Sequence, residues 1–422
     1  MRHRFYLLDN EYIFTFINKF SNIFFGVIVS IFLTRYSGAE LKGEYAVISN
    51  TLSIFALFAN LGIYQAYPKY KRDGCIDVKK KFVNIFYLQF IFLCLIAILC
   101  VIADFNSVVF VLLPLVVLSN QLNFVVMVED VYFKNKANIL SSIVNVIYTL
   151  VLYFFCERNL VFLLGSLVIV DLFLDCIYLI KLKVKPDFSC LSFGFVFEIL
   201  KYSFVPMLSS LLVSLNYKFD IIMLDMFHIN NFYIGQYSLA VSLVGYAWLI
   251  PDIFKEVLFS KTAMNDSVNE INICLKISNF FCIVCIILIC LFGYFAIYIL
   301  FGEEFLSAYP VLMILFLGVP AMSWFKIIST LYLAQGKRMF YFYVLLFSVL
   351  LNVLLNYLSI PYWNIYGAAV ASIFSYTICG YCFLHNYTKL YNIRLVSLFK
   401  FDRNFINELK LFFGGKNGNK RI

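Results

Sequence analysis

The chain alternates long apolar runs with short polar links along nearly its whole length. Windows of high hydropathy predict twelve helices, because one pass through a bilayer needs about 20 mostly apolar residues. The predicted spans cover residues 11–34, 44–67, 82–103, 107–128, 138–156, 159–180, 202–224, 233–257, 276–301, 309–333, 339–360 and 363–387. This pattern predicts an all-α polytopic membrane protein.

Composition agrees with that pattern. Of 422 residues, 63% are hydrophobic and 14% are charged, and the mean hydropathy is +0.89. Soluble domains are about 45–50% apolar and about 25% charged. Because twelve spans use up the apolar residues, no room remains for a separate catalytic domain.

Positive charge is concentrated in the termini and in every second link. All but six of the 33 Lys and Arg residues lie there. Basic links stay on the cytoplasmic side, so we expect both the N and C termini to be cytoplasmic in a bacterial inner membrane. The net charge of +9 then reflects topology and contact with anionic lipids, and we expect no nucleic-acid partner.

A short repeat divides the chain into halves. Gly43-Glu44-Tyr45 and Gly235-Gln236-Tyr237 open the second and eighth predicted spans at an offset of 192 residues. An offset near half the chain indicates a duplication of six spans, which places two parallel repeats around a central cavity. We therefore expect an N-terminal lobe (1–195), a C-terminal lobe (196–388) and a basic amphipathic cytoplasmic tail (389–422).

Three cations fall inside predicted spans: Lys19, Lys218 and Lys326. A lysine at the bilayer centre costs about 2.5–3.5 kcal/mol, so none of the three is expected to face lipid. Each either faces the cavity, or snorkels to the interface, or pairs with an acid. Neutral polar residues such as Asn216 either bond between helices or bind sugar hydroxyls.

Acidic residues within spans have two interpretations as well. Asp171 and Asp175 are four residues apart and share a helix face, so they can bind a cation jointly or relay protons. Alternatively, each neutralises a lysine of a neighbouring helix. Asp252 follows Pro251, which favours a kink with a locally bonded carboxylate.

Cysteine chemistry is not indicated. The chain has twelve cysteines, and Cys282-x-x-Cys285 and Cys379-x-x-Cys382 have the spacing of redox or metal pairs. Both lie within apolar runs without a histidine or a second pair, which favours packing. We expect no metal and no cofactor.

Several motifs resemble one family when they are taken in order along the chain. They are Thr34–Tyr45, Tyr217–Leu224, Ile234–Ala240 with Pro251, Ala334–Lys337 and Tyr366–Ser372. This series is similar to the polysaccharide biosynthesis flippases, Wzx-like members of the MATE-like MOP superfamily. The resemblance implies two six-helix lobes around a cationic lumen. It also implies passage of undecaprenyl-diphosphate-linked oligosaccharide, the unit of O-antigen (in lipopolysaccharide), capsule or exopolysaccharide, to the outer leaflet.

That resemblance assigns roles to the polar residues. We expect Lys19, Lys218, Lys326 and Asn216 to bind substrate, and Asp171, Asp175 and Asp220 to couple transport to H⁺ or Na⁺. The expected partners are the lipid-linked cargo, membrane lipids, and a polysaccharide polymerase with its chain-length regulator. Ala39 stands where the family usually has Pro.

Two rival functions fit the same pattern less well. A MATE-type multidrug or metabolite exporter needs acidic residues for organic cations, whereas three intramembrane lysines favour an anionic cargo. A membrane glycosyltransferase or O-antigen polymerase needs catalytic residues in large outer loops, and the outer links here are short. We therefore expect a transporter and not an enzyme.

Overall fold

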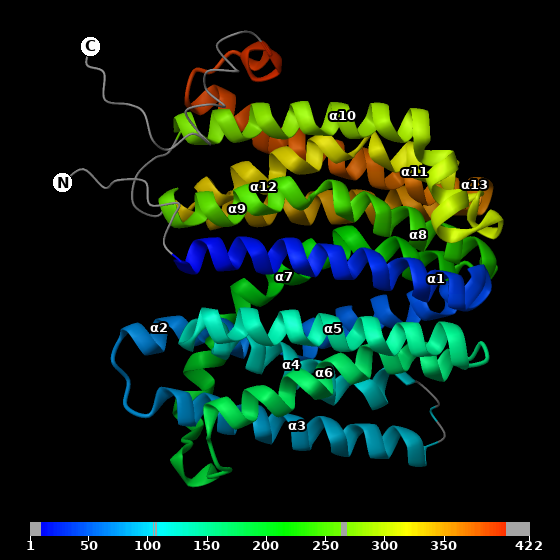
Figure 1. The fold of residues 1–422 in the computed structure, drawn as a ribbon. Helices are drawn as coiled ribbons and strands as arrows, with labels where there is room; N and C mark the ends of the chain where they lie inside the picture. Colours follow the sequence, from blue (N-terminus) through cyan, green and yellow to red (C-terminus); the bar gives the residue numbers. More distant parts are fainter. Residues whose placement is uncertain (1–9, 104, 106–107, 263–267, 402–422) are drawn as a thin grey trace. The chain divides into compact units, whose positions relative to one another are not determined.

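The computed structural model describes residues 10–103, 105, 108–262 and 268–401 (Figure 1). Over these residues the chain forms helices and no strand, which confirms the all-α fold class. The α-helices are α1 (Asn10–Ala59), α2 (Tyr67–Arg72), α3 (Val78–Ile102), α4 (Val108–Glu129), α5 (Val131–Phe155), α6 (Leu160–Leu182), α7 (Phe193–Met226), α8 (Asn231–Ala247), α9 (Leu249–Thr262), α10 (Val268–Phe301), α11 (Ala308–Phe316), α12 (Val319–Ala334) and α13 (Arg338–Leu390). Short 3-10 helices are η1 (Ile63–Ala66), η2 (Phe188–Cys190), η3 (Glu303–Phe305) and η4 (Leu395–Phe399).

The described helices account for the predicted spans. Eight are long and apolar enough to cross a membrane, and two more spans are bent pairs, α8 with α9 at 48° and α11 with α12 at 47°. Two of the eight, α1 and α13, contain a break and each supplies two of the predicted spans. About twelve passes follow.

The break in α1 lies at Gly38, where φ is 64° and ψ is 179°. This backbone conformation favours glycine, since a Cβ would clash with the backbone there. Unbroken, the 50 residues of α1 would extend about 75 Å at 1.5 Å per residue, far beyond a hydrocarbon core of about 30 Å. Figure 1 shows the chain reversing within α1, so that α2 lies at the end where α1 begins.

The break in α13 lies at Asn364, with φ 54° and ψ −134°, three residues after Pro361. Contacts across the break show two antiparallel arms. The Ser359 hydroxyl lies 3.0 Å from the Gly367 carbonyl oxygen, and further from the turn the Asn352 amide donates to the Ser375 hydroxyl at 3.3 Å. The predicted pair of spans at 339–360 and 363–387 is this hairpin.

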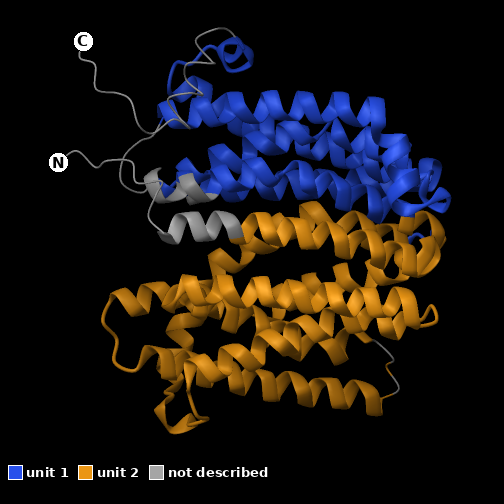
Figure 2. Cartoon of the chain, in the orientation of Figure 1, with its two compact units in different colours: residues 1–8, 226–229, 236–422 blue, residues 9–225, 230–235 orange. Residues whose placement is uncertain are grey.

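The chain forms two compact units (Figure 2). One comprises residues 9–225 and 230–235, and the other comprises 1–8, 226–229 and 236–422. In the first unit, Phe82 and Phe86 of α3, Leu122 of α4 and Tyr178 of α6 are fully buried together. The lobe boundary between residues 195 and 196 stays a prediction.

Ion pairs tie the basic links of the first unit together. Lys71 contacts Glu129 at 2.8 Å, and Lys181 contacts Asp130 at 2.7 Å. Lys80 contacts Asp187 at 2.5 Å, and hydrogen bonds from Lys80 and Ser189 lower the pKa of the Asp187 carboxyl to about 2. Acidic side chains therefore neutralise part of the charge that the sequence places on this side.

The described beginning of the tail is packed against the protein. Leu398 of η4 is buried, and its carbonyl oxygen accepts a hydrogen bond from Asn279 of α10 at 3.1 Å. Phe399 stacks edge-on against Trp324 of α12. The rest of the predicted amphipathic tail, residues 402–422, lies outside the described residues.

Candidate functional site

Polar side chains join α1 to α5 within the apolar part of the first unit. The Asn18 amide donates to Asn135 at 3.0 Å, and Asn22 donates to Asn18 at 3.2 Å. The Ser142 hydroxyl then donates to Asn22 at 3.0 Å. Asn18 and Asn135 are both buried. Hydrogen bonds of this kind hold membrane helices together and also provide groups that recognise hydroxyls.

The acidic pair of α6 lies beside a second group of polar residues. Asp171 and Asp175 interact with each other, and both are close to the Ser119 hydroxyl of α4. One turn further along α6, the Tyr178 hydroxyl lies 3.1 Å from Asn138 of α5. This arrangement supplies oxygen ligands from three helices.

Neither acid of α6 has a cationic partner among the described residues. Asp175 is 4% exposed, and both of its carboxylate oxygens lack a hydrogen-bond partner of good geometry. The alternative in which each acid neutralises a neighbouring lysine is therefore wrong. A buried carboxylate without a partner is costly in a membrane, which marks the site as a place for a proton or a cation.

Helix α7 carries the charged group of the family resemblance. Asn216 and Asp220 are buried, at 0% and 2% exposure. Lys218 is half-buried and makes no ion pair within the described part of the chain, and its surroundings desolvate it without supplying an opposite charge. Lys218 is therefore an uncompensated cation within a membrane helix.

Lys326 of α12 has an acidic partner. Its ammonium donates to both carboxylate oxygens of Asp252 of α9, at 2.7 and 2.9 Å, and lies 5.1 Å above the Trp248 ring. The kink predicted near Pro251 is present as the 48° bend between α8 and α9. The prediction that Asp252 bonds locally is wrong, because its carboxylate reaches across to another helix. Of the three alternatives for this lysine, the structure shows pairing with an acid.

Lys19 lies in the first arm of α1, where its side chain is half-buried next to the buried Asn18. The residues proposed from the sequence are thus divided between the units. Lys19, Asp171, Asp175, Asn216, Lys218 and Asp220 lie in the first, and Lys326 lies in the second.

The sequence analysis did not single out Lys42 as a candidate. Lys42 lies one turn into the second arm of α1, is 8% exposed, and has only the Tyr45 ring near its ammonium, at 5.7 Å. No ion pair reaches it in the described part of the structure. The sequence repeat could have indicated that Lys42 is buried. An offset of 192 residues matches Lys42 with Ile234, an apolar residue that is fully buried.

The cysteine pairs have the environment of packed residues. Cys282 and Cys379 are buried free thiols, and the Cys282 sulfur lies 3.6 Å from the Ser323 hydroxyl. Over the described residues no group of three His, Cys, Asp or Glu side chains is placed to hold a metal ion.

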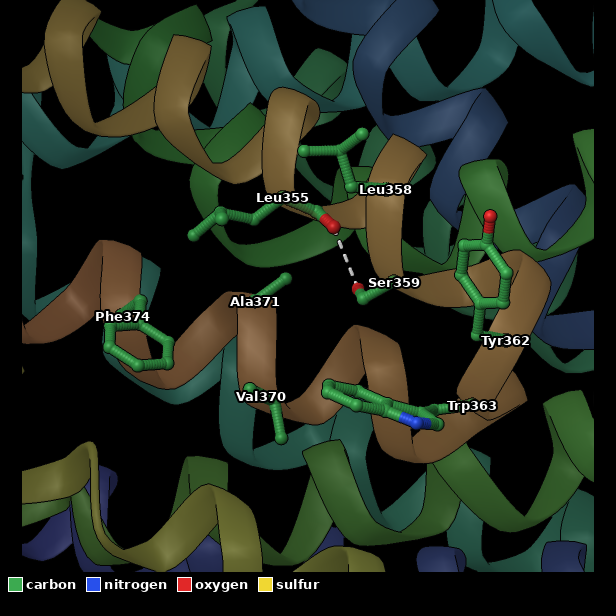
Figure 3. Close-up of a pocket in the computed structure, with 8 residues that line it drawn as sticks. All are labelled: Leu355, Leu358, Ser359, Tyr362, Trp363, Val370, Ala371 and Phe374. Atoms are coloured by element: carbon green, nitrogen blue, oxygen red, sulfur yellow. Dashed lines mark hydrogen bonds between the residues drawn. The ribbon is translucent and has the colours of Figure 1, made fainter.

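An apolar crevice of about 480 Å³ lies between the arms of α13 (Figure 3). It is lined by Leu355, Leu358, Ser359, Tyr362, Trp363, Val370, Ala371 and Phe374. The Ser359 hydroxyl donates a hydrogen bond to the Leu355 carbonyl oxygen at 2.7 Å. The crevice therefore offers an apolar lining and is unsuited to an ion or a sugar.

Comparison with known proteins identifies the fold. No protein-family model and no curated protein sequence matches the chain. A multidrug-resistance MATE transporter of the MOP superfamily, solved in an inward-facing conformation, covers 88% of this chain and 95% of its own with a TM-score of 0.69 and 13% identity. A Vibrio cholerae MATE transporter covers 91% and 95%, with a TM-score of 0.56 and 14% identity.

A third solved structure comes from Pyrococcus furiosus. It is a MOP superfamily transporter whose binding pocket of reverse polarity is described as suggesting a different function. It covers 90% of this chain and 94% of its own, with a TM-score of 0.53 and 14% identity. The chain is thus a multi-pass membrane protein with the fold of the MATE transporters.

Proposed function

We propose that this protein is an alternating-access flippase for an anionic, lipid-linked oligosaccharide. The observation that carries the proposal is the presence of two lysines without acidic partners among the described residues, the buried Lys42 and the half-buried Lys218, in a fold shared with transporters. A lysine in a membrane helix costs about 2.5–3.5 kcal/mol, and an anionic cargo would offset that cost. Lys19 and Lys326 are further candidates for the same role.

The cargo that fits this charge is undecaprenyl diphosphate carrying a sugar unit. Its phosphates and hydroxyls would lose hydration in lipid unless other groups replace the water. Lysines provide the charge, and buried amides such as Asn216 provide hydrogen bonds, while the polyprenyl tail stays in the bilayer. No covalent step is needed, so the protein acts as a transporter and not as an enzyme.

Ion coupling is assigned to the acids. We propose that Asp171 and Asp175, together with Asp220, bind H⁺ or Na⁺ during the cycle. Outward movement of an anion is already favoured by the membrane potential, by about 2.3 kcal/mol per charge at 100 mV. Ion binding would therefore supplement the potential.

The proposed setting is the bacterial inner membrane, with both termini in the cytoplasm. The flipped unit would then reach a polysaccharide polymerase and its chain-length regulator on the outer side, for assembly of O-antigen, capsule or exopolysaccharide.

Complementation of a deletion strain tests the proposal. Deletion is expected to abolish one surface polysaccharide and to leave its lipid-linked precursor in the cytoplasmic leaflet. Lys42→Gln and Lys218→Gln should each reduce surface glycan at least tenfold at equal protein level. Lys183→Gln, at an exposed lysine of a basic link, should restore it fully. Full restoration by both buried-lysine variants would contradict the anionic cargo.

A second candidate function is export of an organic cation. It is favoured by the buried carboxylate of Asp175 in α6, which has no hydrogen-bond partner among the described residues and suits a cationic substrate as well as an ion. Accumulation of ethidium in the deletion strain decides between the two. Higher ethidium retention with unchanged surface glycan would support the exporter, and the reverse result would support the flippase.

A further inference from the structure

An open apolar crevice of about 400 Å³ lies in the first unit where three elements meet. Helix α3 contributes Ile85, Leu88 and Phe92, helix α7 contributes Val196 and Leu200, and the end of α1 with η1 forms the third side. Leu88 and Phe92 are 42% and 61% exposed. Because α3 is long and apolar enough to cross a membrane, the crevice opens toward lipid, and lipid chains have to fill it.

The lining of this crevice suits a hydrocarbon chain. Among the described residues that line it, only Gln89 has a polar side chain. The Gln89 amide nitrogen donates to the Ala59 carbonyl oxygen, and its amide oxygen accepts a hydrogen bond from Gln121 at 2.7 Å. Sugar hydroxyls would lose hydrogen bonds against such a lining, whereas a hydrocarbon chain loses none.

Lys81 lies at the end of the crevice nearest the basic links. It precedes Ile85 by one turn and shares a face of α3 with Leu88, because the three residues are spaced by four and three positions. The Lys81 ammonium lies 5.1 Å from the centre of the Phe195 ring of α7, next to the lining residue Val196. A positive charge is thus held at the mouth of an apolar hollow.

A second lysine lies against the same face of α7. The Lys69 ammonium of α2 is 4.3 Å from the centre of the Tyr202 ring. Phe195 and Tyr202 are seven residues apart, about two turns of a helix, so both rings project from one side of α7. Lys69 and Lys81 are each half-buried. The two rings therefore hold two cations beside the α7 residues that line the crevice.

These two cations are not neutralised within the described part of the chain. Neither Lys69 nor Lys81 makes an ion pair there, in contrast to other lysines of the same link. Glu198 projects from the same side of α7, but it is exposed, and the exposed Lys201 offsets its charge. A net positive charge beside an apolar hollow is complementary to a lipid phosphate and its acyl chain.

The length of the site corresponds to one leaflet of a bilayer. From Lys81 to Phe92, α3 advances eleven residues, or about 16.5 Å at 1.5 Å per residue. Half of a hydrocarbon core of about 30 Å is about 15 Å. An acyl chain that lies along the crevice can therefore keep its phosphate beside Lys81.

We propose that this lysine-capped crevice, lined by α3 and α7 with Lys69 and Lys81 at its mouth, binds an anionic glycerophospholipid from the leaflet next to the basic links. One acyl chain lies in the crevice, and the phosphate contacts both ammonium groups. The bound lipid bridges α3, α7 and the end of α1. The site uses none of the lysines assigned to cargo, so it does not rest on the proposed function.

Tryptophan fluorescence of the full chain in vesicles tests the site. Leu88→Trp places a reporter in the crevice, and Trp248, Trp324 and Trp363 lie in the other unit, so the wild-type signal is subtracted. Brominated dioleoylphosphatidylglycerol, which quenches tryptophan on contact, is mixed with dioleoylphosphatidylcholine. We expect phosphatidylglycerol to bind there at least about fivefold more tightly, because each lysine near a membrane surface contributes about that factor.

A headgroup variant and two controls separate this site from general lipid contact. Lys81→Gln, made in the Leu88→Trp protein, should lower the preference about fivefold. Lys183→Gln, at an exposed lysine of another basic link, should leave it unchanged. Leu99→Trp, at a position of α3 outside the crevice that is 64% exposed, should show no preference. An equal preference at both reporters, or an unchanged preference in Lys81→Gln, would overturn the site.

Competition distinguishes a phospholipid from the cargo lipid. Undecaprenyl phosphate should displace brominated phosphatidylglycerol less effectively than unbrominated phosphatidylglycerol does at the same mole fraction. Displacement that is as effective, or more so, would assign the crevice to a polyprenyl lipid and refute the proposal. Loss of surface glycan in the cargo experiment does not bear on this result.

Native mass spectrometry decides if Leu88→Trp fails to fold. The wild type should keep at least one phosphatidylglycerol at a collision energy that removes phosphatidylcholine. Equal retention of the two lipids by the wild type would contradict the proposal.

Discussion

Unneutralised charge is the property that marks the strongest candidates for a functional role here. Lys326 and Asp252 neutralise each other across two helices, whereas Lys42, Lys218 and the α6 acids have no opposite charge among the described residues. Charges buried without a partner lower stability and persist where a ligand or an ion supplies the partner. The identities of these residues are visible in the sequence, but their pairing is not.

Removing the Asp175 carboxylate of α6 is predicted to leave the stability of the protein unchanged or to raise it. Asp175→Asn removes a desolvated charge that has no cation beside it, so we expect thermal stability in detergent at pH 7 to stay equal or to rise, by about 1–3 kcal/mol. Coupled transport should be lost, because an amide cannot take up a proton or hold a sodium ion as a carboxylate does.

The matched comparison is Asp130→Asn, which removes the partner of Lys181. The Lys181 hydrogen bond lowers the pKa of the Asp130 carboxyl below its usual value, so its contribution is present above about pH 4 and lost as pH falls through the lowered pKa. Asp130→Asn should therefore reduce stability at pH 7. A loss in Asp175→Asn as large as that in Asp130→Asn would argue for a structural role of Asp175.

Several of the helices contain breaks or bends that their length and hydropathy do not reveal. Hydropathy locates α1 and α13 as pairs of spans, and the non-helical residues Gly38 and Asn364 mark where the chain reverses between the two helices of each pair. The bends of about 48° and 47° within the eighth and tenth spans are absent from the hydropathy profile. Such bends depend on the neighbouring helices. After the bend between α8 and α9, Asp252 of α9 contacts Lys326 of α12.

Close packing of α12 against α13 also depends on one glycine. A Cβ on Gly380 would lie 2.0 Å from the Ala321 carbonyl oxygen. Gly380→Ala should therefore force the helices apart and reduce stability by about 1–3 kcal/mol, measured as a lower thermal unfolding midpoint.

Gly26→Ala provides the control for that measurement. Gly26 lies in α1 with no atom within 4 Å of an added Cβ, and alanine is the better helix former by about 0.5–1 kcal/mol. We expect this variant to be as stable as the wild type or more stable. Equal unfolding midpoints for the two variants would show that the α12–α13 approach tolerates a methyl group.

The whole molecule is organised by its duplication and by the orientation of its charge. The reciprocal approach of Gly43 to Asn231 and of Gly235 to Ala39 gives the short sequence repeat a structural meaning. Within the described residues, the basic links carry ion pairs that reduce the charge on their side without reversing its sign. The positive-inside orientation stays a prediction.

Reporter fusions measure that orientation. Alkaline phosphatase fused after Phe305, in the link formed by η3, should be active because this link is predicted to lie outside. The same enzyme fused after Lys183 should be inactive, and a fluorescent protein at the C terminus should fluoresce in the cytoplasm. Activity at Lys183 with none at Phe305 would invert the topology and the proposed direction of transport.

The sequence by itself determined the helical class, the approximate positions of the spans and the half-chain repeat. These follow from local composition, since a segment of about 20 apolar residues has to form a helix in lipid to satisfy its own backbone. Which charges are paired was decided only by the tertiary structure. Asp252 meets Lys326 across 74 residues of chain, and Lys42 is buried although it is charged. Local composition carries no information on such contacts, because they depend on how helices bend and which faces they present to one another.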